Sequence, residues 1–104
     1  MAEVVVSRTA AHQAAATREF YDAKDPDIGT RAVAAILSAF RPLQDHPAIG
    51  RPAIGNPGLR ELVIAFGRSG FVALYRIDRE ADRVVILAVR HQREAGYHGE
   101  KEFD

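Results

Sequence analysis

The chain has 104 residues, 47% of them hydrophobic, and a formal net charge of zero, which fits one small folded domain spanning residues 1–104. It contains no cysteine, which excludes a disulfide framework and a thiolate metal site. The longest apolar run, residues 84–89, is too short to cross a bilayer, and residues 1–13 lack a signal-peptide pattern. We therefore expect a soluble cytoplasmic protein with no membrane partner.

The N-terminal part of the chain predicts a strand followed by a helix. Residues 3–6 form a short apolar strand. Ser7 or Thr9 can cap the helix that follows, because both hydroxyls accept hydrogen bonds from backbone N–H groups at a helix start. Alanines predict that this helix extends over residues 10–23.

A second helix begins at Asp25 and Pro26, since aspartate is a capping residue and proline fits the first helical turn. Apolar residues at helical spacing extend it to near Gln44. The short turn between the helices makes them antiparallel. We expect this hairpin to return the chain to the end where the first strand finishes, so that the next strand runs antiparallel to the first.

The C-terminal half predicts a loop and three strands. Three prolines and three glycines mark residues 46–58 as a loop. The strands are expected at residues 59–66, 71–77 and 83–91, joined by a hairpin loop at 67–70 and a polar turn at 78–82.

These elements predict an α+β fold, in which an N-terminal strand and an antiparallel helical hairpin precede a three-stranded antiparallel meander. The helices are expected to pack on one face of the sheet. Phe71 and Tyr75 share one face of their strand, and we expect them to pack against Phe20 or Phe40.

Several kinds of catalytic and cofactor site are excluded by spacing. None of the four histidines lies in an H-E-x-x-H pattern, so we expect no metal site. The sequence GRSG at residues 67–70 is not the G-x-S-x-G elbow of hydrolases. Gly50 and Gly55 have the spacing of a phosphate loop but lack the lysine that must follow. We therefore expect no cofactor.

Charge is distributed unevenly along the chain. Residues 51–93 contain eight arginines, no lysine and four acidic residues. Arginine suits forked contacts with carboxylate or phosphate, which favours an acidic partner. A GC-rich genome alone can also produce this preference for arginine, so the positions of the arginines carry more information than their number.

The last strand ends in Arg90-His91-Gln92-Arg93, with Tyr97 shortly after. Strand alternation places Arg90 on the face of Val84, Ile86 and Ala88, and His91 on the opposite face, unless the strand has ended or bulged. One interpretation is a solvated strand end with a local Arg93–Glu94 pair. The other is a patch that faces an anionic partner.

The element order, with the stretches HPAIGRP, LREL, GFVALYRID and ILAVRHQREAGY, resembles the RelE/ParE superfamily of type II toxins over residues 4–97. The resemblance implies a toxin neutralised by an antitoxin that wraps around it. RelE-like members cleave messenger RNA on the ribosome with a basic cluster and a histidine or tyrosine. ParE-like members are instead thought to poison DNA gyrase without catalytic residues.

The resemblance favours the ParE-like branch. Residues 59–66 lack the lysine cluster of the RelE-like branch and offer only Arg60, beside Glu61. We therefore expect a gyrase inhibitor in a hetero-oligomer with a ParD-like antitoxin that has an acidic C-terminal segment. The expected contacts with target or antitoxin are Arg60, Arg76, Arg90, His91, Arg93 and Tyr97.

A RelE-like endoribonuclease is the alternative. His91 would then act as general acid or base and Tyr97 would assist it. Arg60 and Arg76 would stabilise charge on phosphate if their strands bring them together with Arg90. Purely structural roles remain equally open at this point, with Arg60 paired to Glu61 or a neighbour and Arg76 paired to Asp78.

Overall fold

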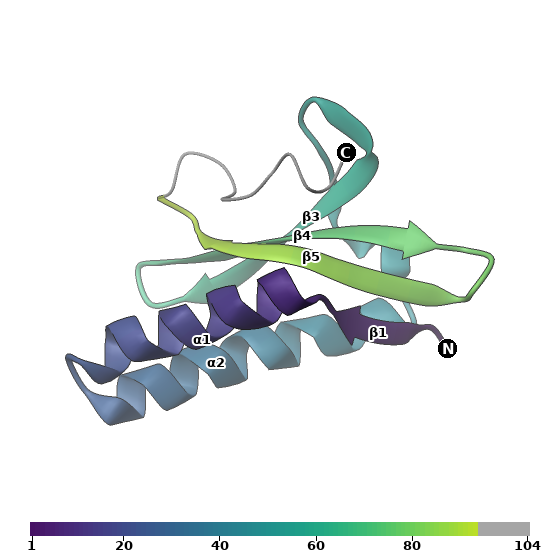
Figure 1. Ribbon diagram of the computed structural model, residues 1–104. Coiled ribbons are helices and arrows are strands. Elements are labelled where there is room, and N and C mark those ends of the chain that lie inside the picture. Colours follow the sequence, from purple (N-terminus) through teal and green to yellow (C-terminus); the bar gives the residue numbers. More distant parts are fainter. Residues whose placement is uncertain (94–104) are drawn as a thin grey trace.

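The computed structural model describes residues 1–93, in which two helices cover one face of a sheet (Figure 1). The elements are β1 (Glu3–Val6), α1 (Arg8–Asp22), α2 (Pro26–Phe40), two 3-10 helices (Arg41–Gln44 and Pro47–Ile49), β2 (Arg51–Ala53), β3 (Asn56–Phe66), β4 (Ser69–Asp78) and β5 (Arg83–His91). The α+β class and the helical hairpin on one sheet face are confirmed. Tyr97 and the expected Arg93–Glu94 pair lie outside the described residues. No helix within residues 1–93 is long and apolar enough to cross a membrane.

Both helix starts follow their sequence signals. Ser7 Oγ accepts from the Ala10 N–H at 3.1 Å and donates to the Leu87 carbonyl at 3.1 Å, which joins the start of α1 to β5. Asp25 caps α2. The predicted end of α2 near residue 44 was wrong, because Pro42 has no N–H to continue the α-helical hydrogen bonds and the chain tightens into a 3-10 turn.

The sheet has five strands in the order β1-β5-β4-β3-β2 and is mixed, because β1 pairs in parallel with β5. Since β3 and β5 are both antiparallel to β4, β3 runs in the same direction as β1. The expectation that this strand runs antiparallel to β1 was therefore wrong. Helix α1 continues in the direction of β1 (Figure 1), so the hairpin returns the chain to the start of β1, where the Ala2 N–H donates to the Gln44 carbonyl at 2.8 Å.

The expected loop at residues 46–58 contains a strand. β2 pairs with β3, which begins at Asn56 instead of Leu59. Pro52 fits here because β2 is an edge strand, where a missing N–H costs no ladder hydrogen bond. The loop at 67–70 is also shorter than expected: Gly67 and Arg68 make the turn, helped by the positive φ of 60° at Gly67.

A bulge in β5 changes which residues face the helices. Leu74 pairs with Ala88 and Tyr75 with Ile86, so Leu87 is an extra residue in β5. Ile86 and then Val89 join the core beneath the helices, whereas Ala88 packs on the opposite side of the sheet. The expectation that residues 84, 86, 88 and 90 share one face was therefore wrong.

The main core lies between the helices and the sheet. Phe71 and Tyr75 are 1% and 0% exposed and belong to the same buried cluster as Phe40, as expected. The other expected partner, Phe20, is 58% exposed. Tyr21 packs against this cluster instead, with its ring edge-on to Phe71 at 6.4 Å.

Candidate functional site

Glu61 lies between two arginines on the sheet face opposite the helices. Its carboxylate is 3.3 Å from Arg51 Nε and 3.8 Å from Arg90 Nη2. Glu61 is buried, and only 15% of the Arg90 side chain is exposed. Arg90 also donates to the carbonyls of His91 and Gln92 at 3.2 and 3.3 Å. The Arg51–Glu61–Arg90 cluster therefore fixes the end of β5 as well as carrying charge.

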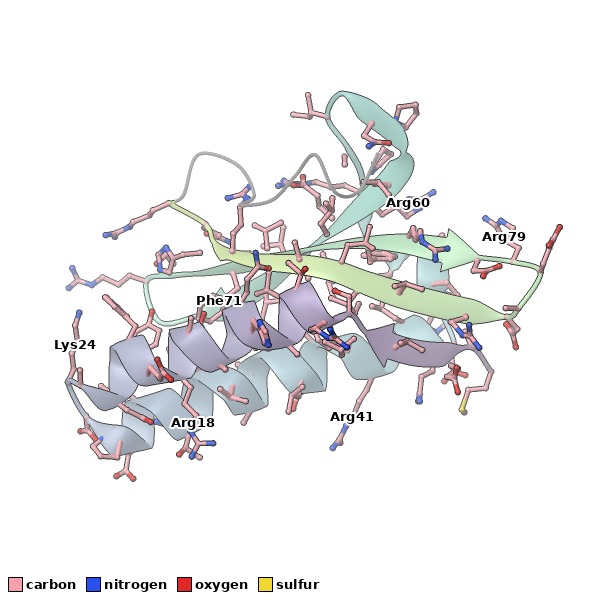
Figure 2. The ribbon with its side chains drawn as sticks, in the orientation of Figure 1. Arg18, Lys24, Arg41, Arg60, Phe71 and Arg79 are labelled. Atoms are coloured by element: carbon pink, nitrogen blue, oxygen red, sulfur yellow. The ribbon has the colours of Figure 1, made fainter. Side chains whose placement is uncertain are left out.

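Arg60 pairs with Tyr75, which belongs to the core under the helices, so Arg60 lies on the other face of the sheet. It is near the base of the β2–β3 hairpin (Figure 2). It donates to the carbonyls of Gly50 at 2.7 Å and Ala48 at 3.4 Å. Beside it, the Tyr75 hydroxyl accepts from the Gly50 N–H at 2.9 Å and donates to the Pro47 carbonyl at 2.7 Å. Arg60 and Tyr75 thus fasten residues 47–50 to the sheet.

The hydroxyl of Tyr75 is buried in this arrangement. Burial raises the pKa of Tyr75 above its usual value of 10.0, while the Gly50 N–H and the Arg60 charge act in the opposite direction. The phenol is therefore held in its neutral form.

We expect Tyr75→Phe to lower the free energy of unfolding by about 1–3 kcal/mol, because it leaves the buried N–H of Gly50 without its acceptor. Urea denaturation measures this change. Since the folded state raises the pKa of Tyr75, its contribution to stability is complete below pH 10 and is lost as the pH rises through the folded pKa. The part of the stability loss at high pH that comes from ionisation of Tyr75 should be absent in Tyr75→Phe.

Tyr21→Phe is the matched control, because the Tyr21 hydroxyl makes no hydrogen bond among the described residues 1–93 and the ring stays packed against the core. Equal stability losses in the two variants would show that the Tyr75 hydroxyl does not hold residues 47–50.

Arg76 is exposed and pairs locally. Its Nη1 lies 4.0 Å from Asp78 Oδ2, which is the structural role left open by the sequence. Arg76 shares a sheet face with Arg90, whose partner in β4 is Val72. Val72 and Arg76 are four positions apart on β4, so Arg90 and Arg76 are separated by about 13 Å along the strand direction. Arg60 lies on the opposite face, so the expected convergence of the three arginines is not observed.

His91 lies on the helix side of the sheet. Its Nδ1 accepts from the Arg93 N–H at 3.2 Å, so the neutral ring carries its proton on Nε2 and donates to Ser69 Oγ at 3.1 Å. The ring stands edge-on to Phe71 at 5.8 Å. Arg90 and His91 therefore point to opposite faces, as strand alternation predicted. Arg93 is exposed and lines a cavity beside His91.

Sequence reasoning missed three contributors to these clusters. Glu61 was considered only as a partner for Arg60, and Arg51 was not considered. Tyr75 was assigned to the core by its ring alone, although a buried tyrosine hydroxyl requires a partner. Within residues 1–93, no three His, Asp or Glu side chains gather where they could hold a metal ion.

The fold and these clusters were compared with known proteins. A family model described as the ParE toxin of the type II toxin–antitoxin system parDE matches residues 4–96. The chain belongs to the ParE toxin family. The ParE-family toxin is 39% identical over 69 residues to Toxin RelE3 of Caulobacter vibrioides, covering 66% of this chain and 71% of that protein. It is 33% identical over 73 residues to the putative toxin Y4kP of Sinorhizobium fredii, covering 70% and 73%.

Two solved structures are similar to this ParE-family toxin. One is from the chromosomal ParDE toxin–antitoxin system of P. aeruginosa, with a TM-score of 0.74, 28% identity and coverage of 88% of this chain and 96% of that chain. The other is from the RelBE2 toxin–antitoxin complex of Mycobacterium tuberculosis, with a TM-score of 0.60, 30% identity and coverage of 88% and 98%. The RelE/ParE resemblance is therefore confirmed, and the chain is a type II toxin.

Proposed function

We propose that this ParE-family toxin inhibits DNA gyrase by binding to it, and that a cognate ParD-like antitoxin neutralises it in a cytoplasmic hetero-oligomer. The family match over residues 4–96 supports the gyrase target. The separation of the candidate nuclease side chains supports inhibition by binding instead of catalysis.

That separation carries the proposal. A ribonuclease needs an acid or base and charge-stabilising groups around one phosphate, each within hydrogen-bond reach of the reacting atoms. Here His91 lies on the helix side with Ser69, and Arg90 lies with Glu61 on the other face. Arg60 donates hydrogen bonds to the carbonyls of residues 48 and 50. These side chains suit separate structural and binding roles.

The surface also suits an acidic antitoxin segment. Arg51, Arg76 and Arg93 are exposed, and the first two lie on strands β2 and β4. β1 and β2 are the edges of the sheet among the described strands, and open edges pair readily with an added strand. An extended acidic segment can therefore combine backbone pairing with charge contacts.

The test is controlled expression of the full chain, followed by measurement of gyrase-dependent DNA cleavage and of messenger RNA integrity in the same cells. We expect growth arrest with cleaved DNA and intact messages. Codon-dependent message cleavage with undamaged DNA would overturn the proposal and favour the RelE-like alternative, which is the outcome suggested by the name of the relative RelE3.

The activity of the His91→Ala variant tests the same proposal at one residue. His12→Ala is the control, because His12 is exposed. A binding toxin should retain most of its activity in both variants. A nuclease that uses His91 as its acid or base should lose roughly 10²–10⁴-fold in rate in the first variant only.

A further inference from the structure

A cavity of about 580 Å³ lies near the turn between α1 and α2, bounded by α1, the start of β4 and the end of β5. Its volume falls within the roughly 300–1,000 Å³ that is typical of small-molecule sites. It opens on the helix side of the sheet, away from the Arg51–Glu61–Arg90 cluster. We call it the α1–β5 pocket, and its lining includes Phe20, Phe71, Lys24, His91 and Arg93.

Aromatic rings form the apolar wall of the α1–β5 pocket. Phe71 is buried beneath it, and Tyr21 stands edge-on to both Phe20 and Phe71, with ring centroids 5.2 and 6.4 Å apart. Phe20 is 58% exposed, although it is a large apolar side chain. An exposed aromatic ring beside other rings in a concave site offers a flat surface on which a ligand ring can stack.

The inner wall of the α1–β5 pocket is fixed by hydrogen bonds. Gln13 Oε1 accepts from the Val89 N–H at 2.7 Å, which ties α1 to β5 just after the bulge. The hydrogen bond between Ser69 and His91 joins the start of β4 to the end of β5. The pocket therefore has walls set by the fold.

Among the described residues that line the α1–β5 pocket, the charged side chains are cations. Lys24 Nζ lies 4.4 Å from the centre of the Phe20 ring, and Arg93 contributes a second cation. Among the described residues that line the pocket there is no aspartate or glutamate. A ligand with negative charge gains from both cations, while its apolar part can contact the aromatic wall.

We propose that the α1–β5 pocket binds a small planar aromatic anion. One or two rings contact Phe20 and Phe71, and a carboxylate, sulfonate or phosphate lies beside Lys24 and Arg93. This site shares Arg93 with the proposed antitoxin surface, but it uses neither the Arg51–Glu61–Arg90 cluster nor the exposed sheet edges.

The probe is indole-3-acetate, titrated into the purified full chain and followed by calorimetry and by amide NMR shifts. Its matched control is indole-3-acetamide, which has the same rings and no charge. We expect saturable binding of the acetate with a dissociation constant of roughly 0.1–1 mM. The largest shifts should lie at Phe20, Lys24 and Phe71, and the amide should bind more weakly.

Two exposed side chains give variants that keep the core intact. Lys24→Gln should weaken binding about twofold to fivefold, and Phe20→Ala should weaken it about fivefold. Arg79→Gln is the charge-matched control, because Arg79 lies at the opposite end of the molecule from Lys24 (Figure 2), and it should not change the affinity.

Three results would overturn the proposal: no saturable binding of the acetate, equal affinity for the acetamide, or equal effects of Lys24→Gln and Arg79→Gln. A second cavity lies between α1 and α2, with Ala11, Val33 and Leu37 in its lining, and shifts centred there would also reject the proposal, since they would place the ligand elsewhere.

Discussion

Phe71→Ala is expected to lower the free energy of unfolding by about 3–5 kcal/mol, because the ring is 1% exposed and its removal leaves a cavity under α1. Phe71 contacts Tyr21, Phe66 and His91 through its ring, so the loss reaches α1 and both neighbouring strands, β3 and β5. For a domain of this size the melting temperature should fall by at least about 12 °C.

Phe20→Ala is the control for this prediction, since it removes the same atoms from a ring that is 58% exposed. Calorimetric and urea unfolding should show a change below about 1 kcal/mol. If the two variants lost equal stability, the assignment of Tyr21 instead of Phe20 as the helix side of this aromatic cluster would be wrong.

Gly50→Ala is expected to cost about 3 kcal/mol or more. An added Cβ would lie 2.5 Å from the Glu61 carbonyl oxygen and 2.6 Å from the Tyr75 hydroxyl. The first neighbour is backbone in the middle of β3 and cannot move aside, so residues 47–50 must lift from the sheet. That movement breaks the hydrogen bonds that this segment makes with Tyr75 and Arg60.

Gly58→Ala is the matched control, because the nearest atom to its added Cβ is 3.8 Å away. It should unfold in urea at nearly the wild-type concentration. Combining Gly50→Ala with Tyr75→Phe should cost less than the sum of the two single changes, since both act through the same contact. Strict additivity would contradict a shared mechanism.

Local signals in the sequence predicted the helices and most strands. Ser7 and Asp25 cap their helices within three residues, so their effect is contained in a short stretch of chain. The partner of β1 was not predictable in this way, because its pairing with β5 joins distant residues. Pro52 in β2 and Pro57 at the start of β3 also made this region resemble a loop, since a proline is rarely expected inside a strand except at a sheet edge or at the start of the strand.

The bulge at Leu87 could not be predicted from the sequence, because residues 84–89 are all apolar and can lie on either face of the sheet. Part of the candidate site was nevertheless predictable: alternation separated Arg90 from His91. The placement of Glu61 between Arg51 and Arg90 was not, because it requires the register of β2, β3, β4 and β5 together.

The parallel pairing of β1 with β5 also sets the order in which the chain can complete its fold. Glu3 and Arg83 are partners 80 positions apart, and Ser7 reaches Leu87 across the same distance. At about 5–20 residues per second of synthesis, the first strand is made about 4–16 s before its partner. The nascent chain therefore carries its helical hairpin well before it has a finished sheet, and truncated products lacking β5 cannot form the surface that a target would meet.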